Sequence, residues 1–516
     1  MLTALRRPRR LEPMRRAVVS GALAVLAVAA MAADAASPGF RYGISAGDVT
    51  STSAILWTRA PRTGKVGLAV STRKSGDLGL AYSGVAREAS DRTIGIKVLL
   101  EPGTRYWYRF DQHGVESAVG TFETAPALNT GATVRFAISG DADATPGANG
   151  KPGFNRYEVY ARMATERNDF NINLGDTIYS DSEIGGAPVA RTVPQKWAKY
   201  KHGLALPALR TLRASAGVYS HWDDHEFIND FSRAENGGAI YQAGVKAFRD
   251  YAPVAQPSAN GLYRTFRWGR HLELFFLDER SFRSAKADEV CAGDLAPTAP
   301  QAVRDAFSSL APALKNPVPP ACLAAIDDPA RTMLGARQYA AFTKAIKASK
   351  ATWKIIVNEV PIQQYYALPY DRWEGYEAER QRLLRFLQAN VKNVVFLTTD
   401  THANFVNEVR HKTLGAVPES SGIWEVVTGP VATNTFAKEI DGFLGTPGAG
   451  TAIGALFFKP PPPNGMGMRC AALDTYSYSQ VTVTARKLTV AMKDARGRPV
   501  QEATGVACAP LVLSAR

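Results

Sequence analysis

Two patterns of apolar residues follow one another along the chain. From Phe40 to Thr124, apolar and polar residues alternate in short runs separated by Gly, Pro, Asp and Thr, a pattern typical of half-buried strands joined by turns. The clearest runs are Ser53–Thr58 and Thr104–Phe110. We therefore predict a small all-β sandwich over residues 37–127.

After a linker near residues 125–133, buried apolar strands alternate with helical stretches. Val134–Ser139 and Phe170–Leu174 are predicted strands, with an amphipathic helix from about Asn155 to Arg167 between them. This order predicts an α/β architecture for residues 132–516. Further buried strands are predicted at Leu272–Leu277, Trp353–Val357, Val394–Thr398 and Trp424–Val427.

The first 36 residues have the pattern of a cleaved export signal. Six arginines precede a weakly apolar Ala/Val stretch at 17–33, and small residues follow at 33–35. Arg15 and Arg16 resemble a twin-arginine signal. The alternative is a membrane anchor, but the stretch is shorter than the roughly 20 residues that a spanning helix needs. We expect a periplasmic or secreted protein that uses the twin-arginine export machinery and has no transmembrane anchor in its mature form.

Composition limits the class of protein but names no activity. Hydrophobic residues at 46% and charged residues at 21% are ordinary for a globular chain and argue against a disordered or polytopic membrane protein. Cleavage would remove six arginines and two acids, so the net charge would fall from +14 to +10. A basic surface attracts phosphate-bearing substrates or envelope polyanions, although an arginine-rich proteome accounts for it equally well.

Four cysteines lie in the mature part of the chain. In an exported protein they permit two disulfides with three connectivities. Sequential pairing is the simplest of these, and neither a zinc spacing nor a Cys-x-x-Cys motif is present. It would join Cys291 to Cys322 and Cys470 to Cys508.

Four short polar segments near predicted strands carry the candidate chemistry: Gly140–Asp143, Gly175–Tyr179, Asp223–Glu226 and Asp400–His402. They offer the carboxylate, phenolate and imidazole ligands that a pair of metal ions needs. Such a pair polarises a phosphoryl oxygen and makes hydroxide available at neutral pH. The pattern indicates phosphate ester hydrolysis.

The position of these residues after strands strengthens the prediction. Asp141 follows the first predicted strand and Asp176 the second, and ligands collect at the carboxyl ends of strands in α/β sheets. Tyr179 would turn its phenol back to the same ion, and His402 adds a nitrogen donor. Each of these residues alone is better explained as a turn former, a cap or a hydrogen-bonded polar group of the core.

The combination is harder to explain without metal. Asp223, Asp224 and Glu226 surround His225, and such carboxylates repel one another unless cations or bases offset their charge. Asn358, after a predicted strand, adds an amide oxygen, and Asp400 with His402 completes the set. The sequence therefore predicts two or more metal ions.

From Phe40 onward the chain resembles PhoD-type alkaline phosphatases. The opening Phe40–Asp48 and Leu56–Arg59 are similar to the fibronectin-like N-terminal domain of that family. The resemblance implies a metallophosphoesterase sandwich of two mixed sheets flanked by helices, related to purple acid phosphatases, behind the fibronectin-like sandwich. In the catalytic part the similar segments are Gly175–Tyr179, His221–Glu226, Leu277–Arg280, Met333–Gly335, Val357–Pro361, Trp373–Tyr376 and Thr399–Ala403.

The resemblance also implies roles by position. His225 would lie near the leaving oxygen as a proton donor or charge stabiliser, and Arg280 would contact phosphate or form an ion pair with Asp278. Asp223 and Glu226 would support the ligands or contact phosphate. The first metal would be held by Asp141, Asp176, Tyr179 and His402, and the second by Asp176 as a bridge, Asp224, Asn358 and Asp400.

One position departs from the family pattern. Many members have a cysteine after the first strand of the catalytic part, where this chain has Asp141. A hard oxygen then replaces a soft thiolate. The family implies Fe3+ with Ca2+, but Mn2+, Zn2+ or Mg2+ become compatible. Asp143 would be a spare ligand or would hold a ligand in place.

The predicted function is an exported metal-dependent phosphatase that works by attack of metal-bound hydroxide on phosphorus. One alternative is a phosphodiesterase or phospholipase D of the same family, and another is a calcium-binding envelope protein without catalysis. A nucleotide-binding ATPase is disfavoured because Gly445–Gly450 lacks the Gly-Lys-Ser/Thr of a phosphate-binding loop. No Gly-x-Ser-x-Gly elbow of a serine hydrolase is present, and no stable nucleic-acid partner is predicted.

Overall fold

The computed structural model describes residues 39–74, 80–414 and 417–516. The predicted export signal at residues 1–36 lies outside the described residues, and so does its predicted cleavage. Within the described ranges, no helix is both long and apolar enough to cross a membrane.

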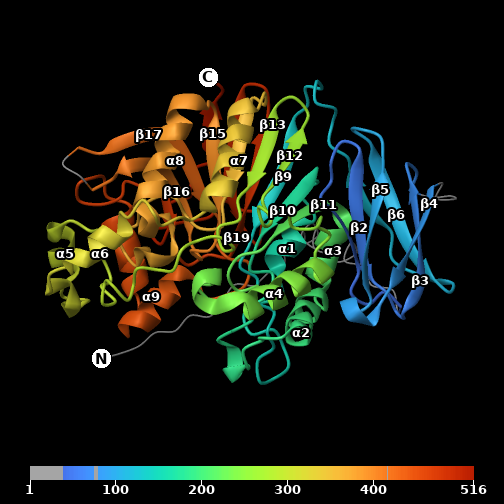
Figure 1. Cartoon of the computed structure of the whole chain (residues 1–516), viewed down its shortest axis with the longest axis horizontal. Helices are drawn as coiled ribbons and strands as arrows, with labels where there is room; N and C mark the ends of the chain where they lie inside the picture. Colours follow the sequence, from blue (N-terminus) through green and yellow to red (C-terminus); the bar gives the residue numbers. More distant parts are fainter. Residues whose placement is uncertain (1–38, 75–79, 415–416) are drawn as a thin grey trace, which may run out of the picture.

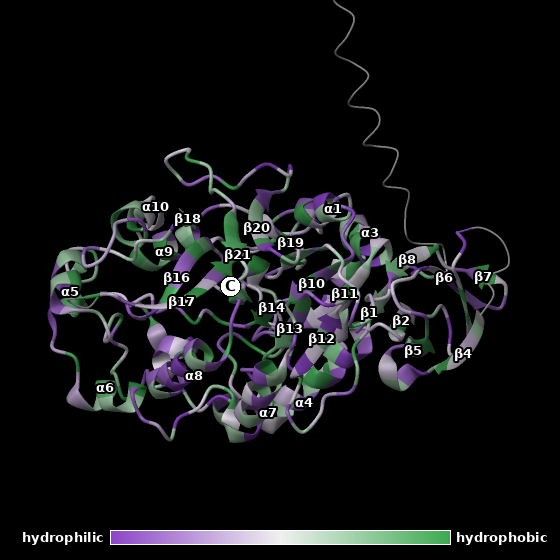
Figure 2. Ribbon diagram, turned by 90° about the horizontal axis from the view of Figure 1, so that it is seen from above, coloured by the Kyte–Doolittle hydropathy of each residue, from purple (hydrophilic) through white to green (hydrophobic). Residues whose placement is uncertain are grey.

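Two large mixed sheets pack face to face, and helices cover their outer faces (Figure 2). Residues such as Phe136 and Ile172 from one sheet and Leu274 and Val357 from the other form the core between them. The first sheet has nine strands in the order β21 (Leu511–Ser514), β20 (Lys487–Asp494), β19 (Ser477–Val483), β9 (Val134–Ser139), β10 (Phe170–Leu174), β11 (Gly217–His221), β1 (Ile44–Gly47), β2 (Ser53–Arg59) and β5 (Thr93–Leu99). The second has seven in the order β12 (Arg264–Trp268), β13 (Leu272–Phe276), β14 (Trp353–Val357), β15 (Val394–Thr398), β17 (Glu419–Val427), β16 (Asn404–Lys412) and β18 (Cys470–Ala472).

The helices form two outer layers and one end of the molecule (Figure 1). Tyr160 and Leu209 on one side, and Phe342 and Leu384 on the other, belong to the apolar clusters that bury the outer faces of the sheets. The first layer contains α1 (Glu158–Met163), α2 (Val193–Leu204) and α3 (Pro207–Ser215), and α4 (Arg233–Tyr251) packs against α2; the second layer contains α7 (Gly335–Ala348) and α8 (Glu377–Asn390); the far end holds α5 (Gln301–Phe307), α6 (Pro320–Ile326), α9 (Phe436–Leu444) and α10 (Ala449–Ile453) (Figure 2).

The predicted N-terminal β-sandwich is present but is not a separate body. Its outer sheet runs in the order β4 (Leu80–Ala86), β3 (Gly64–Ser71), β6 (Arg105–Gln112) and β7 (Val115–Glu116), with β8 (Gly120–Glu123) also paired to β6. Its inner strands β1, β2 and β5 continue the nine-stranded sheet, because β1 pairs in parallel with β11 through Ala46 and Gly217. Sequence patterns did not indicate this shared sheet.

The predicted buried strands are confirmed, with Trp424–Val427 forming the end of the longer β17. The predicted helix at 155–167 is shorter, since α1 spans only Glu158–Met163. Tyr157 has a left-handed backbone with φ of 65°, and its N–H is bound by the side chain of Asn155, so the helix begins after it.

Both predicted disulfides are present. One joins Cys291 to Cys322, and the other joins Cys470 to Cys508. The first closes a Pro/Ala-rich excursion that carries α5 and reaches the far end of the molecule (Figure 1). The excursion therefore has a covalent tie at its base.

Candidate metal centre

The predicted ligands follow strands whose carboxyl ends meet at one edge of the sandwich. Asp141 and Asp176 come two residues after the parallel strands β9 and β10, and Asp400 comes two residues after β15 of the other sheet. The Thr399 hydroxyl donates to the Leu174 carbonyl at 3.2 Å, which joins the two sheets at this edge. The Asp400 N–H donates to the Asp141 carboxylate at 3.3 Å. Segments far apart in sequence thus converge as predicted.

The backbone at four of these residues is left-handed. The φ angles are 56° at Asp141, 48° at Asp176, 66° at Asp400 and 53° at His402. Residues with a β-carbon rarely adopt this conformation, which costs about 1 to 3 kcal/mol each, and it clusters at ligand sites. The sharp turns after the strands set the directions of these four side chains.

The first group of ligand atoms consists of Asp141, Asp176 and His402. One atom from each lies within 4.8 Å of the others, and all three side chains are buried. The phenol oxygen of Tyr179 is 3.0 Å from Nε2 of His402. The Oδ2 atom of Asp141 is buried without a hydrogen-bond partner. A buried carboxylate oxygen without a partner is costly, and a cation at this point would satisfy it. The residues therefore fit a metal ion.

Two further groups of ligand atoms lie beside the first, and one of them shares Asp176 with it. Asp223, Asp224 and Asp400 have ligand atoms within 4.8 Å of one another, and Asp176 forms a similar group with Asp224 and His225. Asp176 therefore belongs to groups on both sides, which suits the bridging role implied for it.

Asn358 follows β14 directly, and its side-chain oxygen is free to bind a cation. Its Nδ2 donates to the Val360 carbonyl at 2.5 Å, which fixes the orientation of the amide. The Oδ1 atom is buried without a hydrogen-bond partner. This is the state expected of an amide oxygen that binds a metal ion.

Burial and crowding oppose ionisation of the carboxylates. Burial is the largest cause at each residue. It raises the pKa of Asp141 to about 6 and that of Asp400 to about 7, in the latter case against the opposing charge of Arg280. Burial, followed by repulsion from Asp224 and Asp223, raises the pKa of Asp176 well above its usual range. Cations among these groups would favour their ionised forms.

His225 lies at the side of this centre and is oriented by a residue that the sequence analysis missed. Its Nδ1 is 2.6 Å from Oδ1 of Asp181, and its ring stacks on Tyr179 with centroids 4.0 Å apart. Burial lowers the pKa of His225, but the carboxylates of Asp224 and Asp181 outweigh it and raise the pKa to about 9. The two carboxylates therefore favour the protonated form of the ring.

The contacts of Arg280 contradict the predicted ion pair with Asp278. Asp278 instead accepts hydrogen bonds from the Trp222 indole at 3.2 Å and the Leu262 N–H at 2.7 Å. The turn after β13 directs the two side chains to different neighbours. Arg280 is fully buried and donates to Asp223, and to Asp371 and Asp400 at 2.7 Å each. Its donors are engaged by protein carboxylates, which favours a structural ion pair over phosphate contact.

The remaining predicted residues hold the loops. Glu226 accepts hydrogen bonds from the N–H groups of Asp176, Thr177 and Asp223 at 2.7 to 2.9 Å. Asp143 accepts from the Thr145 N–H at 2.7 Å and from a serine hydroxyl in the next loop. Among the described residues, the groups of metal-ligand geometry do not include Asp143. This favours a holding role for Asp143 over that of a spare ligand.

Two further carboxylates that the sequence analysis missed support the centre. Glu439 of α9 lies 2.5 Å from Nδ1 of His402, and so leaves Nε2 of that ring directed at Tyr179. Asp371 binds both Arg280 and Arg283. Each comes from a loop or helix remote in sequence, with no local pattern that marks it.

Comparisons with known proteins point to one family. A family model described as PhoD-like phosphatase matches residues 144–462, and one described as PhoD-like phosphatase, N-terminal domain, matches residues 26–126. The chain is 25% identical over 420 residues to alkaline phosphatase D of Bacillus subtilis (strain 168), a match that covers 72% of this chain and 65% of that protein. The match therefore spans slightly less than two thirds of the relative.

Solved structures show the same fold. A structure of PhoD is similar with a TM-score of 0.69 and 20% identity, over 93% of this chain and 89% of that one. The purple acid phosphatase PPD1 from seeds of yellow lupin (Lupinus luteus) is similar with a TM-score of 0.54 and 11% identity, over 91% of this chain and 73% of that one. The two-sheet sandwich flanked by helices is thus the fold of these two phosphatase structures, as predicted.

Proposed function

Because the chain belongs to the PhoD-like phosphatase family, we propose that it is an exported, metal-dependent phosphatase that hydrolyses phosphate esters. The observation that carries the proposal is the pair of overlapping ligand groups that share Asp176. The buried, unpartnered oxygens of Asp141 and Asn358 support it, because they leave a binding demand that cations would satisfy.

The residues divide between two cations. One would be held by Asp141, Asp176, Tyr179 and His402, and the other by Asp176, Asp224, Asn358 and Asp400. When bound, such a pair polarises the phosphoryl oxygen and makes hydroxide available at neutral pH. The phenol of Tyr179 favours a trivalent ion such as Fe3+, and the oxygen-rich second group suits Ca2+ or a smaller divalent ion such as Mn2+, Zn2+ or Mg2+.

Other residues of the chain handle protons and orientation. Asp181 binds Nδ1 of His225, so Nε2 is the ring nitrogen that would give a proton to the departing alcohol. Glu439 holds the ring of His402 in the tautomer that presents Nε2 to a metal. Arg280 fixes Asp400 and Asp223 by charge-assisted hydrogen bonds.

The direct test replaces the shared ligand. Asp176→Ala should abolish turnover of 4-nitrophenyl phosphate and lower the metal content of the purified protein, while the far-UV spectrum stays that of the wild type. Retained activity with full metal content would overturn the assignment of Asp176 as the bridge.

Two alternatives from the sequence are separated by simple measurements. A phosphodiesterase or phospholipase D of the same family would prefer bis-4-nitrophenyl phosphate to the monoester. An envelope protein that only binds calcium would hold metal without hydrolysing either compound. Export through the twin-arginine machinery and a periplasmic or secreted location belong to the proposal through residues 1–36.

A further inference from the structure

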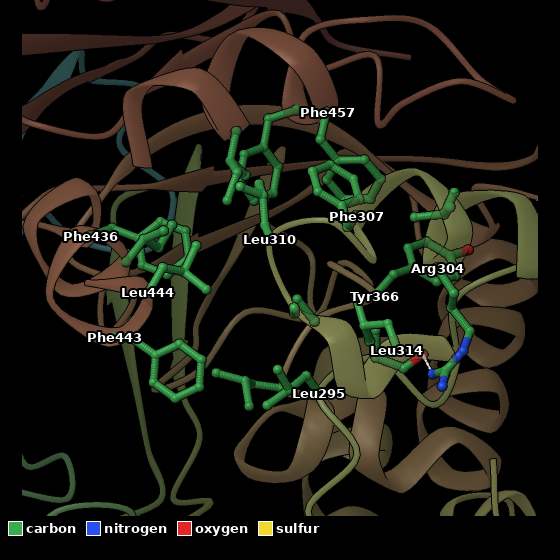
Figure 3. A pocket seen from close by; sticks show the side chains of 18 of the residues that line it. Leu295, Arg304, Phe307, Leu310, Leu314, Tyr366, Phe436, Phe443, Leu444 and Phe457 are labelled. Carbon is green, nitrogen blue, oxygen red and sulfur yellow. Dashed lines mark hydrogen bonds between the residues drawn. The ribbon is translucent and has the colours of Figure 1, made fainter. Parts of the chain in front are cut away.

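An apolar cavity of about 170 Å³ lies at the far end of the molecule, between the disulfide-closed excursion, α9 and the π-helical segment Gly454–Phe458 (Figure 3). Phe307, Leu310 and Leu314 reach it from the excursion, and Phe436 and Phe443 reach it from α9. Arg304 also lines it, but its guanidinium is bound by Asp294 at 2.7 and 2.9 Å. The cavity therefore offers hydrocarbon and aromatic contacts.

Large apolar side chains of the cavity wall are also open to solvent. Phe443 is 65% exposed, Leu368 is 47% exposed and Leu310 is 42% exposed, and all three line the cavity. Single exposed apolar residues are ordinary, but several gathered round one cavity indicate a binding site. The cavity is thus accessible from outside.

Helix α9 joins this cavity to the metal centre. Glu439 binds Nδ1 of His402, and the Phe436 N–H donates to the His402 carbonyl at 3.0 Å. At about 100° per residue, Glu439 lies about 60° around the helix from the cavity residue Phe436 and about 40° from Phe443. One half of α9 therefore faces both the metal ligand and the cavity.

The segment Asp371–Arg372 also connects the cavity to the metal centre. Asp371 binds Arg280, which binds the predicted ligand Asp400, and the next residue, Arg372, lines the cavity. The Arg372 guanidinium lies 5.1 Å from the ring centre of Tyr365 and donates to the Leu368 carbonyl at 3.0 Å. Arg372 thus links the cavity wall to Asp371, and the lining as a whole is apolar.

We propose that this cavity receives the hydrocarbon group of the substrate, so that the protein prefers phosphate esters of apolar alcohols. The proposal rests on the proposed phosphatase function and adds the class of ester. An anionic phosphoryl group at the metal centre and an apolar group beside α9 match the two chemistries of the adjoining sites. A cavity of roughly 150 Å³ lined by similar side chains accommodates benzene, so a ring or a chain of about six carbons would fit.

The test uses two esters of equal intrinsic reactivity. Ethyl and hexyl phosphate have leaving alcohols of similar acidity, and each buried methylene favours binding about fourfold. The wild type should therefore show kcat/KM for hexyl phosphate on the order of 10- to 100-fold above that for ethyl phosphate. Phe443→Ser, at an exposed position, and Ala311→Trp, which fills the cavity, should each bring this ratio close to one.

Leu456→Ser is the matched control. Leu456 is 68% exposed and adjacent in sequence to the cavity residue Phe457, but it does not line the cavity. It should leave the ratio as in the wild type. A wild-type ratio near one, or a ratio that both cavity variants leave intact, would overturn the proposal while the phosphatase function stands.

A binding measurement separates the two proposals. Calorimetry with the non-hydrolysable ethyl and hexyl phosphonates should show tighter binding of the hexyl compound, and Phe443→Ser should remove the difference. If neither phosphate is hydrolysed but this difference is observed, the proposed function fails and the apolar subsite remains. Equal binding of both phosphonates to the wild type would remove the subsite.

Discussion

Two buried clusters of charged residues in this molecule differ in the balance of their charges. At the junction of the sandwich with the helices, Asp91 binds Arg59 at 2.8 Å and Lys201 at 3.1 Å. Burial raises the pKa of Asp91, but the hydrogen bonds from Arg59, Tyr251 and Lys201 outweigh it and lower the pKa to about 2. At the metal centre, burial and repulsion raise the pKa values of Asp141 and its neighbours.

The balance of charge distinguishes a structural ion cluster from a candidate ligand site. The cluster at Asp91 carries its own cations and needs nothing further, so it stabilises the fold. The centre around Asp176 concentrates carboxylates with few protein cations, an arrangement that costs stability unless ions are supplied. Burial alone does not distinguish the two clusters, whereas the presence of paired bases does.

The largest expected effects come from neutralising one carboxylate in each cluster. Asp141→Asn should lower kcat on 4-nitrophenyl phosphate by about 1000-fold, because a ligand charge is lost while Oδ1 still accepts from Asp400. The melting temperature of the chelated protein should not fall. Asp91→Asn should do the reverse, costing about 3 kcal/mol of unfolding free energy and leaving the kcat of the folded protein unchanged. Equal losses of stability in the two variants would contradict the inference that only the cluster at Asp91 stabilises the fold.

A smaller effect is expected at the edge of the centre. Asp181→Asn removes the charge that holds His225 and should lower kcat by roughly 10- to 100-fold with little change in KM. The loss should be greater for hexyl phosphate than for 4-nitrophenyl phosphate, because nitrophenolate leaves without a proton. Glu183→Gln, in the same loop, serves as the control and should stay near wild-type activity. Equal losses on both esters would argue against proton transfer through His225.

The smallest effect is a difference in pH dependence. In the chelated protein, Asp141 and Asp400 have pKa values of about 6 and 7, above their unfolded values, so stability should rise as the pH falls from 7 towards 4. Asp91, with its lowered pKa, contributes stability above pH 4 that is lost as the pH falls towards 2. Melting temperatures across this range, with and without metal, should show a maximum only in the chelated protein. A flat profile between pH 7 and 5 would contradict this account of the crowded centre.

The sequence was informative where chemistry follows regular structure. Asp141 and Asp176 each come two residues after an apolar strand, and their strands are parallel neighbours, which brings the two carboxylates together. Asp400 follows a strand of the other sheet in the same way, and the packing of the two sheets brings it to the same edge. The same regularity predicted β9 and β10 of one sheet and β13, β14, β15 and the end of β17 of the other. The pairing of Cys291 with Cys322 could be anticipated because sequential pairing is the simplest of three choices.

The supporting residues could not be found in the same way. Asp181, Asp371 and Glu439 act on partners 44, 91 and 37 residues away in the sequence, from loops or helices without a repeating pattern. The prediction that Arg280 pairs with Asp278 failed for a related reason, since adjacency in sequence says little about direction after a turn. Tertiary packing decides these contacts.

The parallel pairing of β1 with β11 makes the boundary between the two regions a poor place to cut the chain. A protein that began near Ala132 would lose β1 and leave β11, whose residues are all buried, as a bare edge strand. Unpaired apolar edges recruit other chains, so such a truncated form should aggregate instead of folding as an independent enzyme. A catalytic region that lost the N-terminal region in evolution would need another strand to cover β11.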